Sequence, residues 1–306
     1  MLQPSRGYSP HWSPQAEAVD SPLSQLCNNR IMTMNPIGIF DSGLGGLSVL
    51  REVRSLLPKQ TLLYFADHAR LPYGVRPLTE LRRFSEEITR FLLARRAKTM
   101  VVACNTASAA ALHHLRDTFP DTSFVGMEPA VKPAAYHSRA KTVGVLATEA
   151  TFQGKLFSKA MELFAQEVTV LTEICPGWVD LVERGNIDSS HTNELISKHV
   201  MPLVQSGADT LVLGCTHYSF LKDAIEELLD PSIEIIDPSR AVARQVKHVF
   251  TQDGVTNSVV GESSASITIY TTSNQIRFIR KRVRDLLGLD VEIRQAVLDT
   301  SKHIPN

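Results

Sequence analysis

The stretch KTMVVACNT at residues 98–106 decides the fold, because DTLVLGCTH at residues 209–217 repeats its pattern. In each copy a mostly β-branched, apolar run is followed by a small residue, a cysteine and two polar residues. A short apolar run of this kind predicts a buried strand of a parallel sheet. Because ligands of open α/β sheets gather at the carboxyl ends of strands, we expect Cys104 and Cys215 to face a binding pocket from two equivalent halves.

A structural role is the simplest interpretation of either cysteine alone, since a free cysteine often behaves as a small buried hydrophobe. The repeated context favours chemistry instead, because hydroxyl, amide and imidazole groups follow the cysteines and suit a dry core poorly. Two thiols that face one pocket fit a reaction that removes a proton from one face of a carbon atom and returns a proton to the other.

Bulk composition excludes several classes of protein. The 306 residues are 43% hydrophobic and 21% charged, as in soluble globular proteins. Lys+Arg and Asp+Glu both number 32, and this zero net charge argues against a mainly electrostatic nucleic-acid binder. The four cysteines form no CxxC pair, so no zinc site is predicted, and strand-end thiols favour a reducing cytoplasm. The chain shows neither a membrane-spanning apolar run nor a signal-peptide pattern.

Residues 1–35 differ from the rest, because Pro, Ser and Gly interrupt any periodic pattern, and we expect a flexible N-terminal extension. After it, strands and helices alternate, which predicts parallel sheets. Besides the two cysteine stretches, strands are expected at 37–40, 61–66, 124–126, 142–148, 168–172, 233–236, 267–271 and 290–296. Helices are expected from the glycine-rich turn through Leu57, and at 78–97, 107–117, 151–166, 179–184, 189–206, 219–229, 240–250 and 275–287.

A weak internal duplication supports a fold of two halves. Residues 142–148, TVGVLAT, resemble residues 37–42, IGIFDS, and in each half the cysteine stretch follows at a similar distance. The predicted fold class is therefore α/β, with two pseudo-symmetric α/β domains that contain parallel sheets. The active site is expected in the cleft between the domains, where ligand sites are common.

The glycine-rich turn DSGLGGLS at residues 41–48 joins a strand to a helix, which is a common anion-binding arrangement. It also resembles the dinucleotide-binding fingerprint, with Asp67 as the ribose-binding acid. We discount that interpretation, because Ser48 stands where the fingerprint has Gly or Ala, and the Asp41 carboxylate would repel a pyrophosphate.

Several side chains suit thiol chemistry. His217 follows Cys215 by two residues and can exchange a proton with it, while Asp41 ends another strand in the half of Cys104 and can orient that thiol. Glu183 is a third acid of interest, although a solvated helix residue is its simpler interpretation. Polar groups suited to a ligand with carboxylates are carried by Ser42, Asn105, Thr106, Thr148 and Thr216. No complete cofactor motif is present.

Four ordered motifs give the chain a close resemblance to the glutamate racemases of the cofactor-independent aspartate/glutamate racemase superfamily. These are DSGLGG at residues 41–46, PYG at 72–74, ACNTAS at 103–108 and GCTH at 214–217. Thr148 and Thr151 match a T-x-x-T pair, and YTT at residues 270–272 resembles the closing strand of the family. The resemblance covers about residues 36–298.

The resemblance implies interconversion of L- and D-glutamate without pyridoxal phosphate, which supplies D-glutamate for peptidoglycan. It implies that Cys104 acts on D-glutamate with help from Asp41, and that Cys215 acts on L-glutamate with help from His217 and Glu183. The substrate-binding residues that it implies are Asp41, Ser42, Tyr73, Gly74, Asn105, Thr106, Thr148, Thr216 and His217.

The resemblance also implies an interleaved domain organisation and a set of partners. Residues 36–132 and 237–298 would form the first α/β domain, residues 133–236 the second, and residues 299–306 a tail. Glutamate is the expected small-molecule substrate, and a cell-wall precursor is a candidate activator. Assembly into a homodimer stays an open question at this point. Direct nucleic-acid binding and membrane binding are not expected.

Three alternatives stay open at this point. The same scaffold can racemise aspartate or another amino acid, although the DSGLGG and PYG motifs favour glutamate. A decarboxylase or isomerase relative would use one thiol and need not keep both cysteines. A third, non-enzymatic alternative is action through a protein partner, which zero net charge does not oppose.

Overall fold

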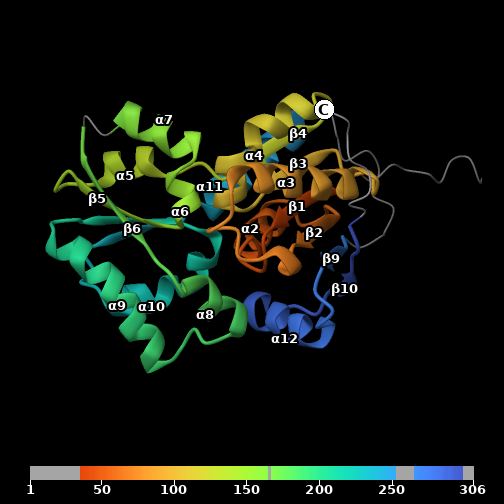
Figure 1. Cartoon of the computed structure of the whole chain (residues 1–306). Helices are drawn as coiled ribbons and strands as arrows, with labels where there is room; N and C mark the ends of the chain where they lie inside the picture. The colour runs from red at the N-terminus through yellow and green to blue at the C-terminus, as the bar shows by residue number, and fades with distance from the viewer. Residues whose placement is uncertain (1–34, 165–166, 253–264, 299–306) are drawn as a thin grey trace, which may run out of the picture. The chain divides into compact units, whose positions relative to one another are not determined.

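The computed structural model describes residues 35–164, 167–252 and 265–298, which contain two parallel sheets (Figure 1). Apart from Asn35, the predicted extension 1–35 lies outside the described residues, as does the predicted tail 299–306. The six-stranded sheet has the order β10-β9-β2-β1-β3-β4 and the four-stranded sheet the order β6-β5-β7-β8.

The strands of the six-stranded sheet are β1 (Ile37–Asp41), β2 (Leu62–Ala66), β3 (Thr99–Val102), β4 (Ser123–Gly126), β9 (Ile267–Thr271) and β10 (Glu292–Gln295). Those of the four-stranded sheet are β5 (Thr142–Ala147), β6 (Thr169–Ile174), β7 (Thr210–Gly214) and β8 (Glu234–Ile236).

The helices are α2 (Leu47–Leu56), α3 (Leu78–Leu93), α4 (Asn105–Thr118), α5 (Val131–His137), α6 (Glu149–Phe152), α7 (Lys155–Phe164), α8 (Trp178–Arg184), α9 (Ser190–Gln205), α10 (Lys222–Glu227), α11 (Ser239–Gln252) and α12 (Ile276–Leu287). Two short 3₁₀ helices are η1 (His68–Arg70) and η2 (Thr216–Leu221).

The two sheets repeat one topology, which confirms the predicted α/β class with pseudo-symmetric halves. The order β2-β1-β3-β4 recurs as β6-β5-β7-β8, and every pairing is parallel. In the first half, β1 lies beside β3, so Asp41 at the end of β1 is next to the strand that leads to Cys104. In the second, β5 lies beside β7 in the same way, and Thr148 and Cys215 follow these two strands.

Alternating side chains of the six-stranded sheet enter two hydrophobic clusters, one on each face. Ile39 and Val101 belong to a cluster with residues of α2, α11 and α12, whereas Phe40 and Val102 belong to a cluster with residues of α3 and α4. The first cluster continues into the second half of the chain, where it includes Trp178. Burial of this continuous apolar surface stabilises the arrangement of the two strand ends that carry the cysteines.

Three helix predictions were wrong in their bounds. The helix expected at 78–97 ends at Leu93, because Arg96 has a left-handed φ of 66° that a helix does not accommodate. The helix expected at 151–166 is two helices, α6 and α7, separated at Gly154, where a Cβ atom would lie 2.4 Å from the Cβ of Ala109. The helix expected at 219–229 begins as η2 at Thr216 and continues as α10.

The two-domain division stays a prediction. The strands divide between the sheets in the interleaved way that the division requires, but the described residues form one compact unit. Among these residues, no helix has the length and apolar character needed to cross a membrane.

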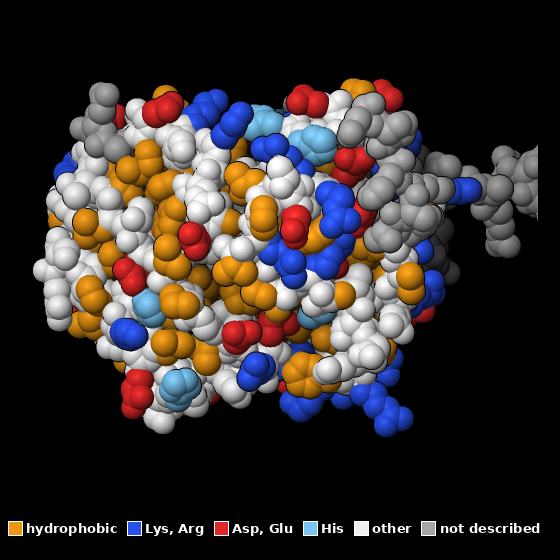
Figure 2. Space-filling view, viewed as in Figure 1, with side chains coloured by type: hydrophobic (Ala, Val, Ile, Leu, Met, Phe, Trp, Pro, Cys, Tyr) orange, Lys and Arg blue, Asp and Glu red, His pale blue; other side chains and the backbone are white. Residues whose placement is uncertain are grey.

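Helix α12 carries a basic surface, which lies toward the lower right in Figure 2. Its exposed basic residues are Arg277, Arg280, Lys281 and Arg284. Asp285 pairs with Lys281 at 2.8 Å, and Asp290 pairs with Arg284 at 3.1 Å, so neighbouring carboxylates partly neutralise this surface.

Candidate active site

The two cysteines follow the carboxyl ends of β3 and β7, and each directly precedes a helix. The Sγ atom of Cys104 accepts a hydrogen bond from the backbone N–H of Ala107 at 3.4 Å, at the first turn of α4. Cys215 precedes η2, and its side chain makes no capping hydrogen bond there. Both cysteines therefore lie at helix N-termini, Cys104 at an α-helix and Cys215 at a short 3₁₀ helix. Cys104 and Cys215 are 5% and 7% exposed, which shields both thiols from bulk water.

Cys104 lies in surroundings that favour its protonated form. Burial raises the pKa of this thiol well above its usual value, the negative charge of Asp41 raises the pKa further, and the N–H of Ala107 opposes both effects. A negative charge on Cys215 also raises the pKa of Cys104, so the two sulfur atoms lie within electrostatic reach of each other. Cys104 is thus a neutral thiol that can donate a proton.

Asp41 is held rigidly beside Cys104. It is the last residue of β1 and is fully buried, and its Oδ2 atom accepts a hydrogen bond from the backbone N–H of Gly46 at 2.9 Å. The start of α2 therefore fixes the carboxylate. That Asp41 orients Cys104 stays a prediction.

Cys215 faces a different group, an imidazole paired with a carboxylate. The Nδ1 atom of His217 lies 3.8 Å from the Sγ of Cys215, and its Nε2 atom lies 2.7 Å from the Oε1 of Glu183. His217 and Glu183 are 2% and 8% exposed. Glu183 is therefore a buried partner of His217, which rules out its simpler interpretation as a solvated helix residue.

The charges of this pair stabilise each other. Burial lowers the pKa of His217, but hydrogen bonds with Cys215 and Glu183 outweigh burial and raise this pKa well above its usual value. Burial raises the pKa of Glu183, but hydrogen bonds from His217 and His68 outweigh it and lower this pKa. The pair is thus an imidazolium and a carboxylate, and its imidazole faces the sulfur atom of Cys215.

We expect Glu183→Gln to change the pH dependence of stability. The lowered pKa of Glu183 contributes stability above about pH 4.5, and this is lost as the pH falls through the folded pKa. The raised pKa of His217 contributes stability that is complete below about pH 6.5 and is lost as the pH rises through the folded pKa. At pH values between about 4.5 and 6.5, Glu183→Gln should therefore lower the free energy of unfolding by on the order of 1–3 kcal/mol.

Urea denaturation at a series of pH values measures this effect. Glu86→Gln is the control, because Glu86 pairs with His114 at 3.1 Å on a more exposed surface, and its loss should cost less. A cost of Glu183→Gln that is equal at all pH values would contradict the charged pair.

The glycine-rich turn packs directly on this pair. The backbone N–H of Leu44 donates to the Oε1 of Glu183 at 2.7 Å, and the backbone nitrogen of Gly45 lies 3.2 Å from the Nε2 of His217. A Cβ atom on Gly43 would lie 2.1 Å from Glu183 Oε1, and one on Gly45 would lie 2.4 Å from His217 Nδ1. Glycine is required at both positions because the backbone approaches the two side chains closely.

Gly45→Ala should therefore displace the imidazole of His217 from Cys215. We expect kcat/KM for the reaction at this site to fall by roughly 100-fold, since a misplacement of about 1 Å can cost that much. Steady-state kinetics measures the loss, and circular dichroism checks that the variant is folded. An unchanged kcat/KM in a folded variant would show that this close packing does not position His217.

Polar groups without partners follow both cysteines. Among the described residues, the Oδ1 of Asn105 and the Oγ1 of Thr216 are buried and have no hydrogen-bond partner. Buried polar atoms are normally paired, so a bound ligand is the natural partner for these two. Each atom belongs to the residue directly after a cysteine, which places a ligand between the two halves.

Hydroxyl groups from both halves also meet at the site. The Oγ1 of Thr106 lies 2.9 Å from that of Thr148 and 3.3 Å from that of Thr151. Ser42 is 5% exposed and directly follows Asp41. The substrate-binding role of Ser42, Thr106 and Thr148 stays a prediction.

The PYG loop contributes its backbone rather than the tyrosine hydroxyl. The carbonyl of Gly74 accepts a hydrogen bond from the N–H of Ala150 at 3.2 Å, and a Cβ atom on Gly74 would lie 2.9 Å from that of Thr148. The hydroxyl of Tyr73 donates to the carboxylate of Asp67 and is thereby already engaged. The structure thus brings Gly74 to the site, while the Tyr73 hydroxyl serves to anchor the loop.

His68 was missed as a site residue. It is the second residue after β2, and its Nε2 atom lies 3.2 Å from the Oε2 of Glu183. The available signal was a titratable residue close to a strand end, next to Asp67. Within the described ranges, no group of three or more His, Cys, Asp or Glu side chains is arranged to hold a metal ion.

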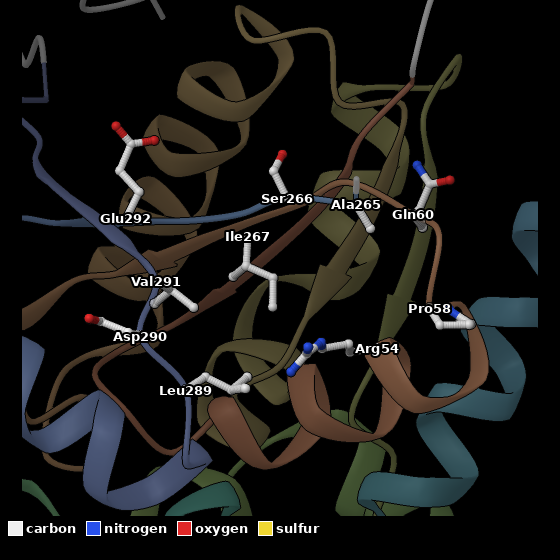
Figure 3. A pocket seen from close by; sticks show the side chains of 10 residues that line it. All are labelled: Arg54, Pro58, Gln60, Ala265, Ser266, Ile267, Leu289, Asp290, Val291 and Glu292. Carbon is white, nitrogen blue, oxygen red and sulfur yellow. The ribbon is translucent and has the colours of Figure 1, made fainter. Parts of the chain in front are cut away.

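A separate cavity of about 290 Å³ lies at the opposite strand ends (Figure 3). Its lining includes Gln60 before β2, Ser266 before β9, and Glu292 at the start of β10. The cysteines follow the carboxyl ends of their strands, so this cavity is not part of the candidate site.

Comparisons with known proteins give one family. The family model described as Asp/Glu/Hydantoin racemase matches residues 44–246. The chain is 44% identical over 258 residues to a glutamate racemase of Ectopseudomonas mendocina, a match that covers 84% of this chain and 97% of the relative.

Solved structures give the same result. The chain resembles a glutamate racemase from Francisella tularensis solved in complex with D-glutamate, with 26% identity, a TM-score of 0.76, and coverage of 87% of this chain and 99% of that one. It also resembles the Escherichia coli glutamate racemase in complex with L-glutamate and the activator UDP-MurNAc-ala. That match has 27% identity, a TM-score of 0.73, and coverage of 85% of this chain and 97% of that one.

Proposed function

The chain belongs to the Asp/Glu/hydantoin racemase family, and we propose that it interconverts L- and D-glutamate with Cys104 and Cys215 as two bases on opposite faces of the α-carbon. The observation that carries this proposal is the contrast between two equivalent thiols. One thiol lies beside the Asp41 carboxylate, and the other lies beside the imidazole of His217, which is paired with Glu183.

With L-glutamate, Cys215 acts as the base with help from His217 and removes the α-proton, and the thiol of Cys104 donates a proton to the opposite face. The stereochemistry of the α-carbon is thereby inverted. In the reverse direction Cys104 must first lose its proton, and the carboxylate of Asp41 is placed to accept it.

A thiolate alone is too weak a base for the α-proton of an amino acid. Preorganised donors must stabilise the charge that develops on the α-carboxylate in the transition state. Hydroxyl and amide groups of Ser42, Asn105, Thr106, Thr148 and Thr216 are placed to bind the carboxylates of glutamate, and the nearly buried site strengthens these contacts.

The family needs no cofactor, and pyridoxal phosphate has no part in this mechanism. The product D-glutamate serves peptidoglycan synthesis. We place the reaction in the cytoplasm, because its chemistry depends on free, reduced thiols. We also propose that the chain forms a homodimer, and sedimentation of the full chain would test this.

Incubation of the purified chain with L-glutamate, without added cofactor, tests the activity. Chiral chromatography should show D-glutamate approaching equal amounts of the two enantiomers, and aspartate should react much more slowly. Faster racemisation of aspartate would show that aspartate, and not glutamate, is the preferred substrate. The absence of any inversion with either amino acid, in the presence and absence of an activator, would overturn it.

The activator is proposed by analogy with the Escherichia coli complex that contains UDP-MurNAc-ala. Addition of this compound to the assay should raise kcat/KM for L-glutamate. Equal rates with and without the compound would contradict activation, but they would not contradict the proposed racemisation.

A further inference from the structure

Glu183 lies between two imidazole rings rather than beside one. Its Oε1 atom is 2.7 Å from the Nε2 of His217, and its Oε2 atom is 3.2 Å from the Nε2 of His68. The side chains of His68, Glu183 and His217 are 11%, 10% and 2% exposed, so little solvent competes with these contacts. The chain of contacts therefore leads from His68 through Glu183 and His217 to Cys215.

His68 is itself held at its other ring nitrogen. Its Nδ1 atom lies 2.7 Å from the Oγ1 of Thr271, the last residue of β9. The ring is thus fixed between the end of β9 and the carboxylate on α8. The contact with Thr271 fixes the ring so that its buried Nε2 atom faces the carboxylate of Glu183 at ion-pair distance, without a hydrogen bond of its own among the described residues.

The two carboxylate oxygens of Glu183 have separate partners. Oε1 accepts the N–H of Leu44 and contacts His217, whereas Oε2 is the oxygen that His68 contacts. Without His68, this second oxygen would be a nearly buried charge with one partner fewer, and the carboxylate would gain freedom to rotate. Rotation would move Oε1 away from His217, because both oxygens belong to one planar group.

We propose that His68 is a positioning residue for the Cys215 half of the reaction. It holds Glu183, which orients the imidazole of His217 toward the sulfur atom of Cys215. This inference rests on the proposed two-base racemisation of glutamate. Its consequence is that loss of His68 slows proton transfer at Cys215 and leaves proton transfer at Cys104 unchanged.

Rates alone cannot locate such a defect. L- and D-glutamate are mirror images with equal free energies, so any variant must lose the same factor of kcat/KM in both directions. Primary deuterium isotope effects do locate it. If transfer at Cys215 becomes slower, the isotope effect with α-deuterated L-glutamate increases, because Cys215 breaks that bond. The effect with α-deuterated D-glutamate decreases, because Cys104 breaks that bond in a step that is no longer limiting.

Two substitutions of His68 test whether its contact with Glu183 matters, rather than the histidine side chain as such. The amide nitrogen of His68→Gln occupies a position near Nε2 and can still donate to Glu183. The shorter side chain of His68→Asn places its amide near Nδ1, where it keeps the Thr271 contact and loses Glu183. We expect kcat/KM to fall roughly tenfold in His68→Asn, with the paired change in isotope effects, and to stay near the wild-type value in His68→Gln.

His114→Asn is the matched control, because His114 pairs with Glu86 at 3.1 Å on a surface where its side chain is 38% exposed. It should leave the rate and both isotope effects unchanged. If His68→Asn does not fold, Thr271→Val provides a second variant that releases the other ring nitrogen and should shift the isotope effects in the same directions.

Isotope effects in His68→Asn or Thr271→Val that equal those of the wild type would overturn the inference, even if the rate falls, because the loss would then be structural. A wild-type chain that does not racemise glutamate would instead overturn the proposed function. The two failures are therefore distinguishable within one experiment.

Discussion

Cys104→Ser and Cys215→Ser should each lower kcat/KM for glutamate racemisation by about 10³-fold or more. A serine hydroxyl loses its proton far less readily than a thiol, so neither serine can act as the base. Each direction of the reaction uses both positions, one as base and one as acid. Both variants should therefore be inactive in both directions, as measured by chiral chromatography over long incubations.

Each variant should still perform half of the reaction. A glutamate analogue with a leaving group on the β-carbon needs only removal of the α-proton for elimination, which breaks the bond to the leaving group and forms a Cα–Cβ double bond. Cys104→Ser retains Cys215 and should act on the L-analogue, whereas Cys215→Ser retains Cys104 and should act on the D-analogue. The same preferred enantiomer in both variants would contradict the assignment of the bases.

Cys175→Ser is the control for these substitutions. Cys175 is a free thiol, 3% exposed, whose pKa is raised by burial and by the charge of Glu173, as expected for an inert cysteine. Its replacement should leave racemisation within a few-fold of the wild-type rate. A loss comparable to that of the other two variants would show that serine harms the fold rather than the chemistry.

Asp41→Asn should give the second-largest loss, about 10²–10³-fold in kcat/KM. The amide oxygen of asparagine can still accept the N–H of Gly46, so the turn at the start of α2 should be retained. The amide cannot accept a proton from Cys104, which then serves poorly as a base. Unfolding in urea should confirm that the variant is about as stable as the wild type.

The isotope effects of Asp41→Asn should change in the opposite sense to those of His68→Asn. Proton transfer at Cys104 becomes the slow step, so the effect with α-deuterated D-glutamate increases and the effect with the L-enantiomer decreases. Changes of the same sign in both variants would mean that Asp41 and His68 do not serve different cysteines.

The repeated cysteine stretches were sufficient to predict the parallel sheets and the equivalent placement of Cys104 and Cys215. An apolar run of strand length and the turn after it are local features, and parallel strands bring their carboxyl ends to one edge. Asp41 was predictable for the same reason, since it ends the strand beside β3.

Contacts that depend on the packing of distant elements were not predictable in this way. His68 meets Glu183 only because the end of β2 lies near α8, and no periodic pattern records that proximity. The burial of Glu183 depends on the glycine-rich turn that covers it. The hydrogen bond between the Tyr73 hydroxyl and Asp67, which joins two residues of the segment that follows β2, was not predictable from the sequence either.

The most direct test of the two-base mechanism is racemisation of L-glutamate in deuterated water, stopped early and analysed for configuration and α-deuterium together. Because Cys104 donates a solvent-derived proton, the D-glutamate formed should carry deuterium at the α-carbon, while the remaining L-glutamate is largely protiated. D-glutamate that retains the original α-proton, or residual L-glutamate that is deuterated as fully as the product, would indicate a single base and contradict the mechanism.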